Sequence, residues 1–260
     1  MIEVIPIPCL EDNYAYLLDD GSGGLAVVDA SDAPPIERAL TGRRGRLTAI
    51  FATHHHHDHV GGNEALIGAH PGLRVFGFES DRGRIPGQTE FLADQEVFAW
   101  GGAQVRALHI PGHTLGAVAY AVEGLVFTGD TLFLAGCGRL FEGTPAMMHR
   151  SLNEVLARLD PRTRIYCGHE YTVSNLLFAA SVEPGNGQVS QRLSEAKGRR
   201  ARGEPTVGTT LQEELDTNPF LRCAKPELRA SAGAGPDATE VDVFAALRRA
   251  KDVFRPPASP

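Results

Sequence analysis

The feature that most restricts the fold of this chain is a histidine-rich segment directly after an apolar run. The run Leu47–Thr53 predicts a strand, and four histidines, an aspartate and a fifth histidine follow it. Side chains alternate in direction along extended backbone, so His54 and His56 are expected to converge while the histidines after each of them point elsewhere. Asp58 and His59 lie beyond the strand end and are free to turn toward a second ion. The segment therefore predicts a metal site in a loop at the carboxyl end of a strand.

The same local pattern recurs three times further along the chain. Each time an apolar run ends at a glycine, and a metal-binding side chain follows, at Gly112-His113, Gly129-Asp130 and Gly168-His169. One such pair alone has little meaning, and four histidines in a row are also compatible with a solvated tract. The repetition beside the histidine-rich segment favours one shared metal centre.

These residues are enough to ligate two ions. A carboxylate has two oxygens and can bridge two metals, whereas a neutral imidazole cannot. We predict one ion on His54, His56 and His113, a second ion on Asp58, His59 and His169, and Asp130 as the bridge between them. Imidazole and carboxylate ligands suit zinc best, with iron or manganese as alternatives. Two such ions would generate a bridging hydroxide, with Asp58 and Asp130 as the catalytic carboxylates. Asp29, at the end of an earlier strand, is either a support for this site or a turn residue.

Composition excludes several classes of protein. The net charge is −7, which argues against a nucleic-acid binder, since such a protein needs a basic surface. No apolar run is long enough to cross a membrane. The four cysteines are scattered without CxxC spacing, which fits reduced thiols. We therefore expect a cytoplasmic protein without a nucleic-acid or membrane partner. We also expect a monomer, although composition does not determine the oligomeric state.

The apolar runs change in character near Glu170. Before it, short runs bounded by Gly, Asp or Pro predict strands, with helical patterns between them, the longest being Pro145–Leu159. After it the strand signal stops, and the pattern predicts helices at Tyr171–Val182, Val189–Arg202, Thr209–Leu215 and Glu240–Phe254. We predict a metal-binding domain over residues 1–170 and a helical substrate-binding domain over residues 171–260.

The motifs identify the chain as similar to a known family. The HxHxDH core at His54–His59 resembles that of the metallo-β-lactamase superfamily. Within this superfamily, Thr53–Asn63, Pro111–Thr114 and Phe127–Thr131 resemble the THHHxDHxGGN, PGHT and FTGDT motifs of the glyoxalase II family. The GCG-containing loop Gly136–Gly143 and the GHEYT motif Gly168–Thr172 are narrower signals, and they resemble glyoxalase II, the hydroxyacylglutathione hydrolases. The resemblance implies an α+β fold, a four-layer αβ/βα sandwich followed by a small C-terminal helical domain.

The resemblance also implies an activity. Members of the family hydrolyse S-D-lactoylglutathione to glutathione and D-lactate at a binuclear metal site, in the second step of methylglyoxal detoxification. The two carboxylates of glutathione require cations on one wall of the site. The family resemblance assigns the glycine carboxylate to Arg248 and Lys251, on the flank of the last helix, and the glutathione backbone to the hydroxyl of Tyr171. The loop residues Arg139, Leu140 and Phe141 complete the predicted substrate-binding set. Arg139 stands where some members have lysine, and Phe141 where some have tyrosine.

Other functions on this fold are alternatives. A lactonase or a hydrolase of a different thioester would use the same metal ligands, and a non-catalytic metal-binding module would need the ligands without a substrate wall. A basic helix flank is often simply solvated, and a tyrosine at a helix start is often a core residue. Turnover of glutathione thioesters distinguishes these interpretations.

Overall fold

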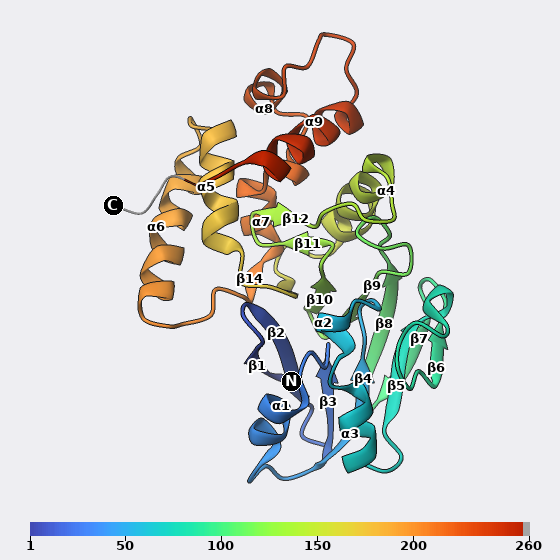
Figure 1. Cartoon of the computed structure of the whole chain (residues 1–260). Coiled ribbons are helices and arrows are strands. Elements are labelled where there is room, and N and C mark those ends of the chain that lie inside the picture. The colour runs from blue at the N-terminus through green and yellow to red at the C-terminus, as the bar shows by residue number, and fades with distance from the viewer. Residues whose placement is uncertain (257–260) are drawn as a thin grey trace.

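The computed structural model describes residues 1–256 and consists of two β-sheets with helices on the outside (Figure 1). The first sheet has six strands in the order β1-β2-β3-β4-β5-β6. Its strands are β1 Glu3–Cys9, β2 Asn13–Asp19, β3 Gly24–Val28, β4 Arg46–Phe51, β5 Arg74–Phe78 and β6 Glu90–Leu92. The first three are antiparallel neighbours, and β3 to β6 run parallel to one another. The short β6 is absent from the sequence prediction.

The second sheet has the strand order β14-β13-β10-β9-β8-β7. Its strands are β7 Val97–Trp100, β8 Ala103–His109, β9 Val118–Val122, β10 Leu125–Gly129, β13 Arg164–Cys167 and β14 Thr209–Thr210. Only β10 and β13 pair in parallel, so their carboxyl ends lie at the same edge. A separate hairpin pairs β11 Leu132–Phe133 with β12 Gly136–Cys137.

The side chains of β2 point alternately into two different cores, and this shows how the layers form. Tyr16 and Leu18 belong to the core between the two sheets, whereas Leu17 belongs to a second core that includes Ile36 and Leu66. Residues two apart on a strand face the same side, so one strand supplies both cores. Helices α1 (Ala33–Leu40) and α3 (Asn63–Ala69) cover that second core on the outside of the first sheet (Figure 1).

Aromatic rings fill much of the space between the sheets. The ring of Tyr16 lies 5.5 Å from that of Phe127, and the ring of Phe51 stacks on Tyr120 at 5.2 Å. Each pair joins a strand of the first sheet to a strand of the second. Aromatic side chains of this size bury large apolar areas, so these contacts supply much of the free energy that holds the sheets together.

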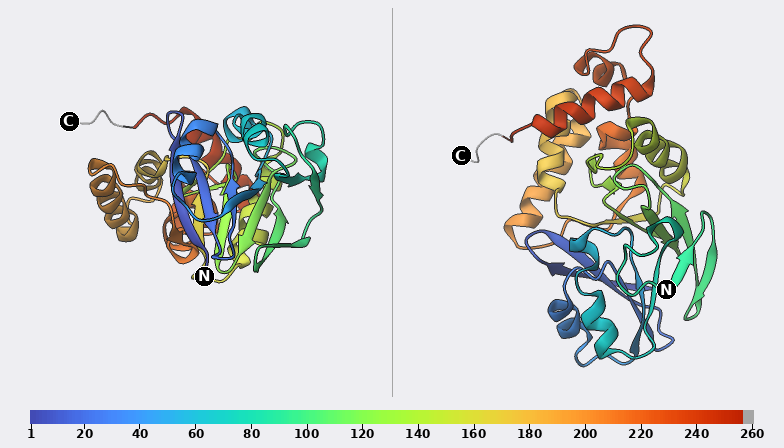
Figure 2. Two further views of the ribbon diagram at one scale, coloured as in Figure 1. Left: turned by 90° about the horizontal axis from the view of Figure 1, so that it is seen from below. Right: turned by 45° about the vertical axis from the view of Figure 1, so that its right-hand side comes forward.

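Five helices from the C-terminal part of the chain occupy one end of the sandwich (Figures 1 and 2). They are α5 Thr172–Val182, α6 Gly187–Ala201, α7 Leu211–Thr217, α8 Pro226–Ser231 and α9 Glu240–Val253. Residues 257–260, the end of the predicted second domain, lie outside the described residues. Among the residues that are described, none of the helices combines the length and the apolar character needed to cross a membrane.

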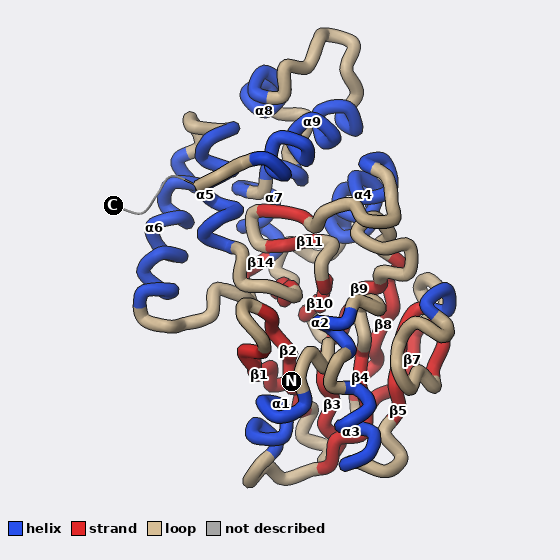
Figure 3. The backbone as a smooth tube through the Cα atoms, viewed as in Figure 1, coloured by secondary structure: helices blue, strands red, loops and turns tan. Residues whose placement is uncertain are grey.

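Two predictions for secondary structure were wrong in part, as the backbone trace in Figure 3 allows the reader to follow. The single helix expected at Pro145–Leu159 is α4 (Pro145–Arg150), then a π-helical turn at Ser151–Val155 and a 3₁₀ turn. Strand pairing also does not stop near Glu170, because Thr209–Thr210 forms β14 and pairs with β13. Two residues carry no readable alternation, and their pairing depends on a partner far away in the chain.

The β11–β12 hairpin is fixed to the helices by buried polar groups. Glu214 on α7 is fully buried, pairs with Arg192 of α6 and accepts the backbone N–H of Ala135 at 2.7 Å. The amide of Asn218 donates to Gly136 at 2.9 Å and to Glu214 at 2.9 Å. The hairpin therefore depends on a buried charge pair in the helical part of the chain.

Replacing Glu214 by alanine should destabilise the fold strongly. The change leaves the Arg192 guanidinium buried without its counter-charge, which typically costs about 3–5 kcal/mol. Chemical denaturation followed by circular dichroism measures the loss of free energy of unfolding.

The neighbouring Glu213 provides the control. Its carboxylate is exposed and accepts the N–H of Thr210 in a helix cap, so Glu213→Ala should cost only about 1 kcal/mol. Equal effects of the two substitutions would contradict the proposed importance of the buried pair.

Candidate metal centre

The seven predicted ligands come from loops at the carboxyl ends of four strands and from one short helix. His54 and His56 follow β4, and Asp58 and His59 lie on α2 (His57–Val60). The remaining three follow β8, β10 and β13, and they are His113, Asp130 and His169. Because β10 and β13 are parallel neighbours, the residues after them emerge side by side.

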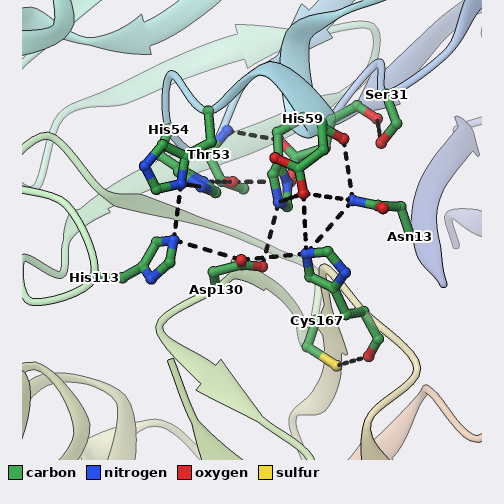
Figure 4. A network of polar contacts seen from close by, with 12 residues as sticks. Asn13, Ser31, Thr53, His54, His59, His113, Asp130 and Cys167 are labelled. Atoms are coloured by element: carbon green, nitrogen blue, oxygen red, sulfur yellow. Dashed lines mark hydrogen bonds and ion pairs between the residues drawn. The ribbon is translucent and has the colours of Figure 1, made fainter. Parts of the chain in front are cut away.

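Three histidines form the first group. The Nε2 atom of His54 lies 3.0 Å from Nδ1 of His56, and the same Nδ1 lies 3.0 Å from Nε2 of His113 (Figure 4). Their ligand atoms all lie within 4.8 Å of one another. Three ring nitrogens that face a common point have the arrangement needed to hold one ion.

The second group contains Asp58, His59 and His169, whose ligand atoms also lie within 4.8 Å of one another. Asp58 Oδ2 is 3.4 Å from Nε2 of His169. Asp130 lies between the groups, 3.3 Å from Nε2 of His59, 3.2 Å from Nε2 of His169 and 3.5 Å from Nε2 of His113. Its carboxylate is therefore in contact with both groups, as the bridging prediction requires.

Two buried polar atoms indicate that these side chains are arranged for a cation. His59 Nε2 and Asp130 Oδ1 are buried and lie 3.3 Å apart, yet neither makes a hydrogen bond of acceptable geometry among the described residues. Leaving such atoms unpaired in a buried site costs free energy, which a bound metal would offset. A mixed set of imidazole and carboxylate donors suits zinc, iron or manganese.

Asp29 supports this cluster from behind and also occupies a turn conformation. Its Oδ2 lies 2.9 Å from Nδ1 of His59, and its carboxylate accepts the backbone N–H of Thr53 at 2.8 Å and its hydroxyl at 2.8 Å. Its φ is +53°. Asp29 is therefore both a support for the site and a turn residue, the two alternatives that the sequence left open. A hydrogen bond at Nδ1 orients the ring and leaves Nε2 facing the site.

Close approach explains the glycine before His169. A Cβ atom at Gly168 would overlap the carboxylate of Asp130 and the ring of His59. Any side chain here would push the two loops apart and enlarge the site. The glycine is thus required by the geometry of the cluster.

The pKa values of the histidines are shifted in opposite directions in the two groups. Burial, with a smaller contribution from the neighbouring His113, lowers the pKa of His56 to about 4. Burial lowers the pKa of His54 well below its usual value, and the nearby His59 adds to this. These rings therefore stay unprotonated near neutral pH, with lone pairs free for a metal. Burial also acts to lower the pKa of His169, but hydrogen bonds to Asp130 and Asp58 outweigh it and raise the pKa to about 10.

A cavity of about 870 Å³ opens beside the cluster. Five of the six predicted substrate-binding residues line it, namely Arg139, Phe141, Tyr171, Arg248 and Lys251. Leu140 does not, because it lines a smaller neighbouring pocket of about 340 Å³. Metal ligands and basic side chains thus share one cavity.

The two cations of α9 are held firmly. Arg248 is buried, 5% exposed, because it donates to the carbonyl of Cys137 at 2.7 Å and pairs with Asp252 at 3.0 Å. Lys251 donates to the carbonyl of Ser174 at 3.2 Å. Arg248 is therefore packed into the protein and is not a solvated cation on the flank of α9.

Sequence reasoning missed a polar cluster on another wall. His55 was expected to point elsewhere, yet it lines the cavity and its Nδ1 lies 3.2 Å from Asp81. Arg84 contacts the other ring nitrogen of His55 and pairs with Glu142. Asp81 and Arg84 lie in no motif, and Glu142 lies in the loop Gly136–Gly143 but has no recognisable role in the sequence alone. Asp12 and Asn13, which contact His169 and Asp58, were missed for the same reason.

Comparison with known proteins places these features in a family. Residues 10–169 match the metallo-beta-lactamase superfamily, and residues 170–254 match the family described as hydroxyacylglutathione hydrolase C-terminus. A hydroxyacylglutathione hydrolase of Methylococcus capsulatus is 50% identical over 98% of this chain and 100% of its own length. One of Arabidopsis thaliana, named as cytoplasmic, is 41% identical over 98% of this chain and 100% of its own.

Solved structures share the fold at lower identity. ETHE1 from Myxococcus xanthus superimposes with a TM-score of 0.66, at 22% identity, over 98% of this chain and 93% of its own. A protein crystallised in a di-iron-bound form has a TM-score of 0.58 at 26% identity, over 84% of this chain and all of its own.

Substitution of Asp130 by alanine tests whether its carboxylate is shared by the two ligand groups. The variant should lose at least one of two bound ions and nearly all turnover, because both groups then lack their shared carboxylate. Metal analysis of the purified protein, beside a thioester hydrolysis assay, measures both effects.

Asp160→Ala serves as the control, since this exposed carboxylate pairs with Arg162. It should retain the metal content of the unmodified protein. Full metal content and near-normal activity in the Asp130 variant would rule out the bridging role.

Proposed function

The chain belongs to the hydroxyacylglutathione hydrolase family of the metallo-β-lactamase superfamily. From this membership we propose a role for each residue of the site in the reaction. The enzyme hydrolyses the thioester S-D-lactoylglutathione to glutathione and D-lactate, the second step of methylglyoxal detoxification. Lactonase activity and a non-catalytic metal-binding role are not favoured, because relatives that match over nearly the full length are hydroxyacylglutathione hydrolases.

The family implies a binuclear site for divalent metals, and we assign its ligands. One ion would bind His54, His56 and His113, the other Asp58, His59 and His169, with Asp130 shared. Two divalent ions bound there would polarise the thioester carbonyl and lower the pKa of a water molecule. We propose zinc as the metal, with iron or manganese as alternatives that the same ligands accept. The di-iron form of a relative supports iron as an alternative.

Asp58 would also orient the attacking water, besides binding a metal ion. Its side chain is 41% exposed and lines the cavity, so its carboxylate can accept a hydrogen bond from the attacking water and orient it. The departing group is a thiolate, and free thiols have a pKa of about 8.5. Such a leaving group needs no obligatory proton donor, so the chain does not have to supply a general acid.

The opposite wall would bind glutathione. We assign its glycine carboxylate to Lys251 and Arg248, and the tripeptide backbone to the hydroxyl of Tyr171, whose ring stacks on His169 with centroids 4.9 Å apart. Arg139 adds a further cation at the mouth, and Phe141 offers an apolar contact where a tyrosine would offer a hydroxyl. The observation that carries the proposal is that these cations and the ligand cluster line the same cavity.

We also propose a cytoplasmic, monomeric enzyme. The four cysteines are all free and buried, which suits a reducing compartment, and one relative is named as cytoplasmic. The proposed ligands and the substrate wall come from one chain, so a single copy would suffice for activity. Size-exclusion chromatography with light scattering measures the mass in solution.

A panel of substrates tests the reaction. Hydrolysis of S-D-lactoylglutathione should exceed turnover of a lactone and of glutathione persulfide by at least about 100-fold in kcat/KM, because only the thioester suits both walls of the cavity. Chelation of the metals should abolish the activity, and readdition of zinc, iron or manganese should restore it. A preference for the lactone or for the persulfide would overturn the proposed substrate.

Lys251→Ala should mainly raise KM for glutathione thioesters. A charged hydrogen bond is worth about 1.5–3 kcal/mol, so the expected increase is about tenfold or more, with kcat changed much less. Burial and the nearby Arg248 lower the pKa of Lys251 to about 8, so the ammonium is charged below that pH and neutral above it. In the unmodified enzyme kcat/KM should therefore fall as pH rises through about 8.

Two variants distinguish substrate binding by Lys251 from a non-specific effect of the substitution. Lys251→Arg keeps its charge at high pH and should lose the alkaline fall in kcat/KM. Lys197→Ala, an exposed lysine of α6, should leave KM unchanged. An unaltered KM in Lys251→Ala would show that the lysine does not bind the substrate.

A further inference from the structure

Two consecutive residues contact the second ligand group, Asp12 at the end of the turn between β1 and β2 and Asn13 at the start of β2. Asp12 Oδ1 lies 2.8 Å from Nδ1 of His169. The side-chain amide of Asn13 donates to Oδ2 of Asp58 at 3.1 Å and to the backbone carbonyl of Asp58 at 3.1 Å (Figure 4). One short turn therefore reaches two of the three proposed ligands of the second ion, although these are far away in the sequence.

Backbone hydrogen bonds fix this turn against the loop that carries His169. The N–H of Glu170 donates to the carbonyl of Asp12 at 2.9 Å, and the N–H of Tyr14 donates to the carbonyl of Gly168 at 2.8 Å. The hydroxyl of Tyr14 also donates to Glu170 at 2.8 Å. The turn and the loop are thus held in one register, so the side chains of Asp12 and Asn13 have little freedom to move away.

The first ligand group is oriented by different partners. His54 Nδ1 lies 3.1 Å from the hydroxyl of Thr53, and His113 Nδ1 lies 2.9 Å from the carbonyl of Arg139. Among the hydrogen bonds of the described residues, none links Asp12 or Asn13 to the first group. The two groups share Asp130 and are joined through Thr53 and Asp29, whereas the contacts of Asp12 and Asn13 reach the second group alone.

The chemistry of these outer contacts also differs. A carboxylate at Nδ1 fixes the tautomer of a histidine and makes its Nε2 a more basic ligand than a hydroxyl or a carbonyl does. His169 has such a partner in Asp12. Asp58 sits on the four-residue helix α2 with its side chain 41% exposed, and the amide of Asn13 restrains its carboxylate. Loss of either contact should weaken the second group selectively.

We propose that Asp12 and Asn13 are positioning residues for the second metal ion, so that this ion can be lost while the first is retained. The inference rests on the ligand assignment of the proposed function. Outer partners of metal ligands typically contribute 10–100-fold to metal affinity. Removal of Asp12 or Asn13 should therefore weaken binding of the second ion by about that factor, with the affinity for the first ion largely unchanged.

Metal loading of the full chain with manganese(II) as the probe tests this inference. The metal-free protein is titrated with manganese, the bound metal is counted by mass spectrometry, and electron paramagnetic resonance distinguishes a coupled pair from a single ion. The unmodified protein should bind two ions and give the coupled signal. Asn13→Ala and Asp12→Ala should bind one ion at the same free manganese concentration and give the signal of an isolated ion.

Control variants make the outcome specific. Asp12→Asn keeps an oxygen acceptor without the charge and should weaken the second ion less than Asp12→Ala. His56→Ala removes a proposed ligand of the first ion and should leave the second. Asp19→Asn, at the other end of β2, changes a carboxylate that accepts the N–H of Gly21, and it should bind two ions. Thermal unfolding of the metal-free variants shows whether each one is folded, and the mild Asp12→Asn change serves if an alanine variant is not.

The possible failures are distinguishable. If the unmodified protein binds one ion, the binuclear assignment fails and the inference fails with it. If the unmodified protein binds two ions and the folded Asp12 and Asn13 variants bind both as tightly, the ligand assignment stands and the inference is overturned. Equal weakening of both ions in these variants would also overturn it.

Discussion

The structure depends on bringing five imidazoles and two carboxylates into contact in a site that is mostly shielded from water. Such groups are costly to bury unless each polar atom has a partner. Their outer atoms are satisfied by protein groups, such as Asp29 on His59, whereas the inner atoms face one another. Divalent cations, which the family implies, would be suitable partners for these inner atoms. The requirement to hold cations therefore explains why so many polar side chains occupy the carboxyl ends of the strands.

The sandwich satisfies this requirement because its two sheets contribute ligands from different directions. The parallel pairing of β10 with β13 places Asp130 next to His169, and the loop after β4 brings the histidines of the first sheet to the same edge. A backbone hydrogen bond of 2.9 Å from Val118 to Thr53 joins the two sheets close to this edge. The position of each ligand therefore depends on sheet pairing more than on the loops themselves.

Much of this arrangement could be predicted from the sequence, for reasons that particular residues show. Strand ends followed by Gly and a ligand are local patterns, so the residues around His113, Asp130 and His169 could be recognised without a structure. The contact between Asp12 and His169 joins residues 157 positions apart, and that between Asn13 and Asp58 joins residues 45 apart. Neither pair has a signature in spacing or composition, because only the packing of β2 against α2 and against the loop after β13 brings these residues together. Leu140 lines the neighbouring pocket, and the sequence could not show this because side-chain direction in an irregular loop does not follow a period.

The helical part of the chain lies beside the active site and is also joined to it by hydrogen bonds. Glu214 and Asn218 hold the β11–β12 hairpin, and Arg248 of α9 donates to the carbonyl of Cys137 at the end of that hairpin. The same hairpin continues into the loop that bears Arg139, whose carbonyl orients His113. The cations that would select glutathione are thus mechanically connected to a ligand of the first ion. The second ion depends instead on the N-terminal hairpin through Asp12 and Asn13. The substrate wall also contacts the second group directly, because the ring of Tyr171 stacks on His169 and the ring of Phe133, in the β11–β12 hairpin, lies 5.9 Å from that of His169.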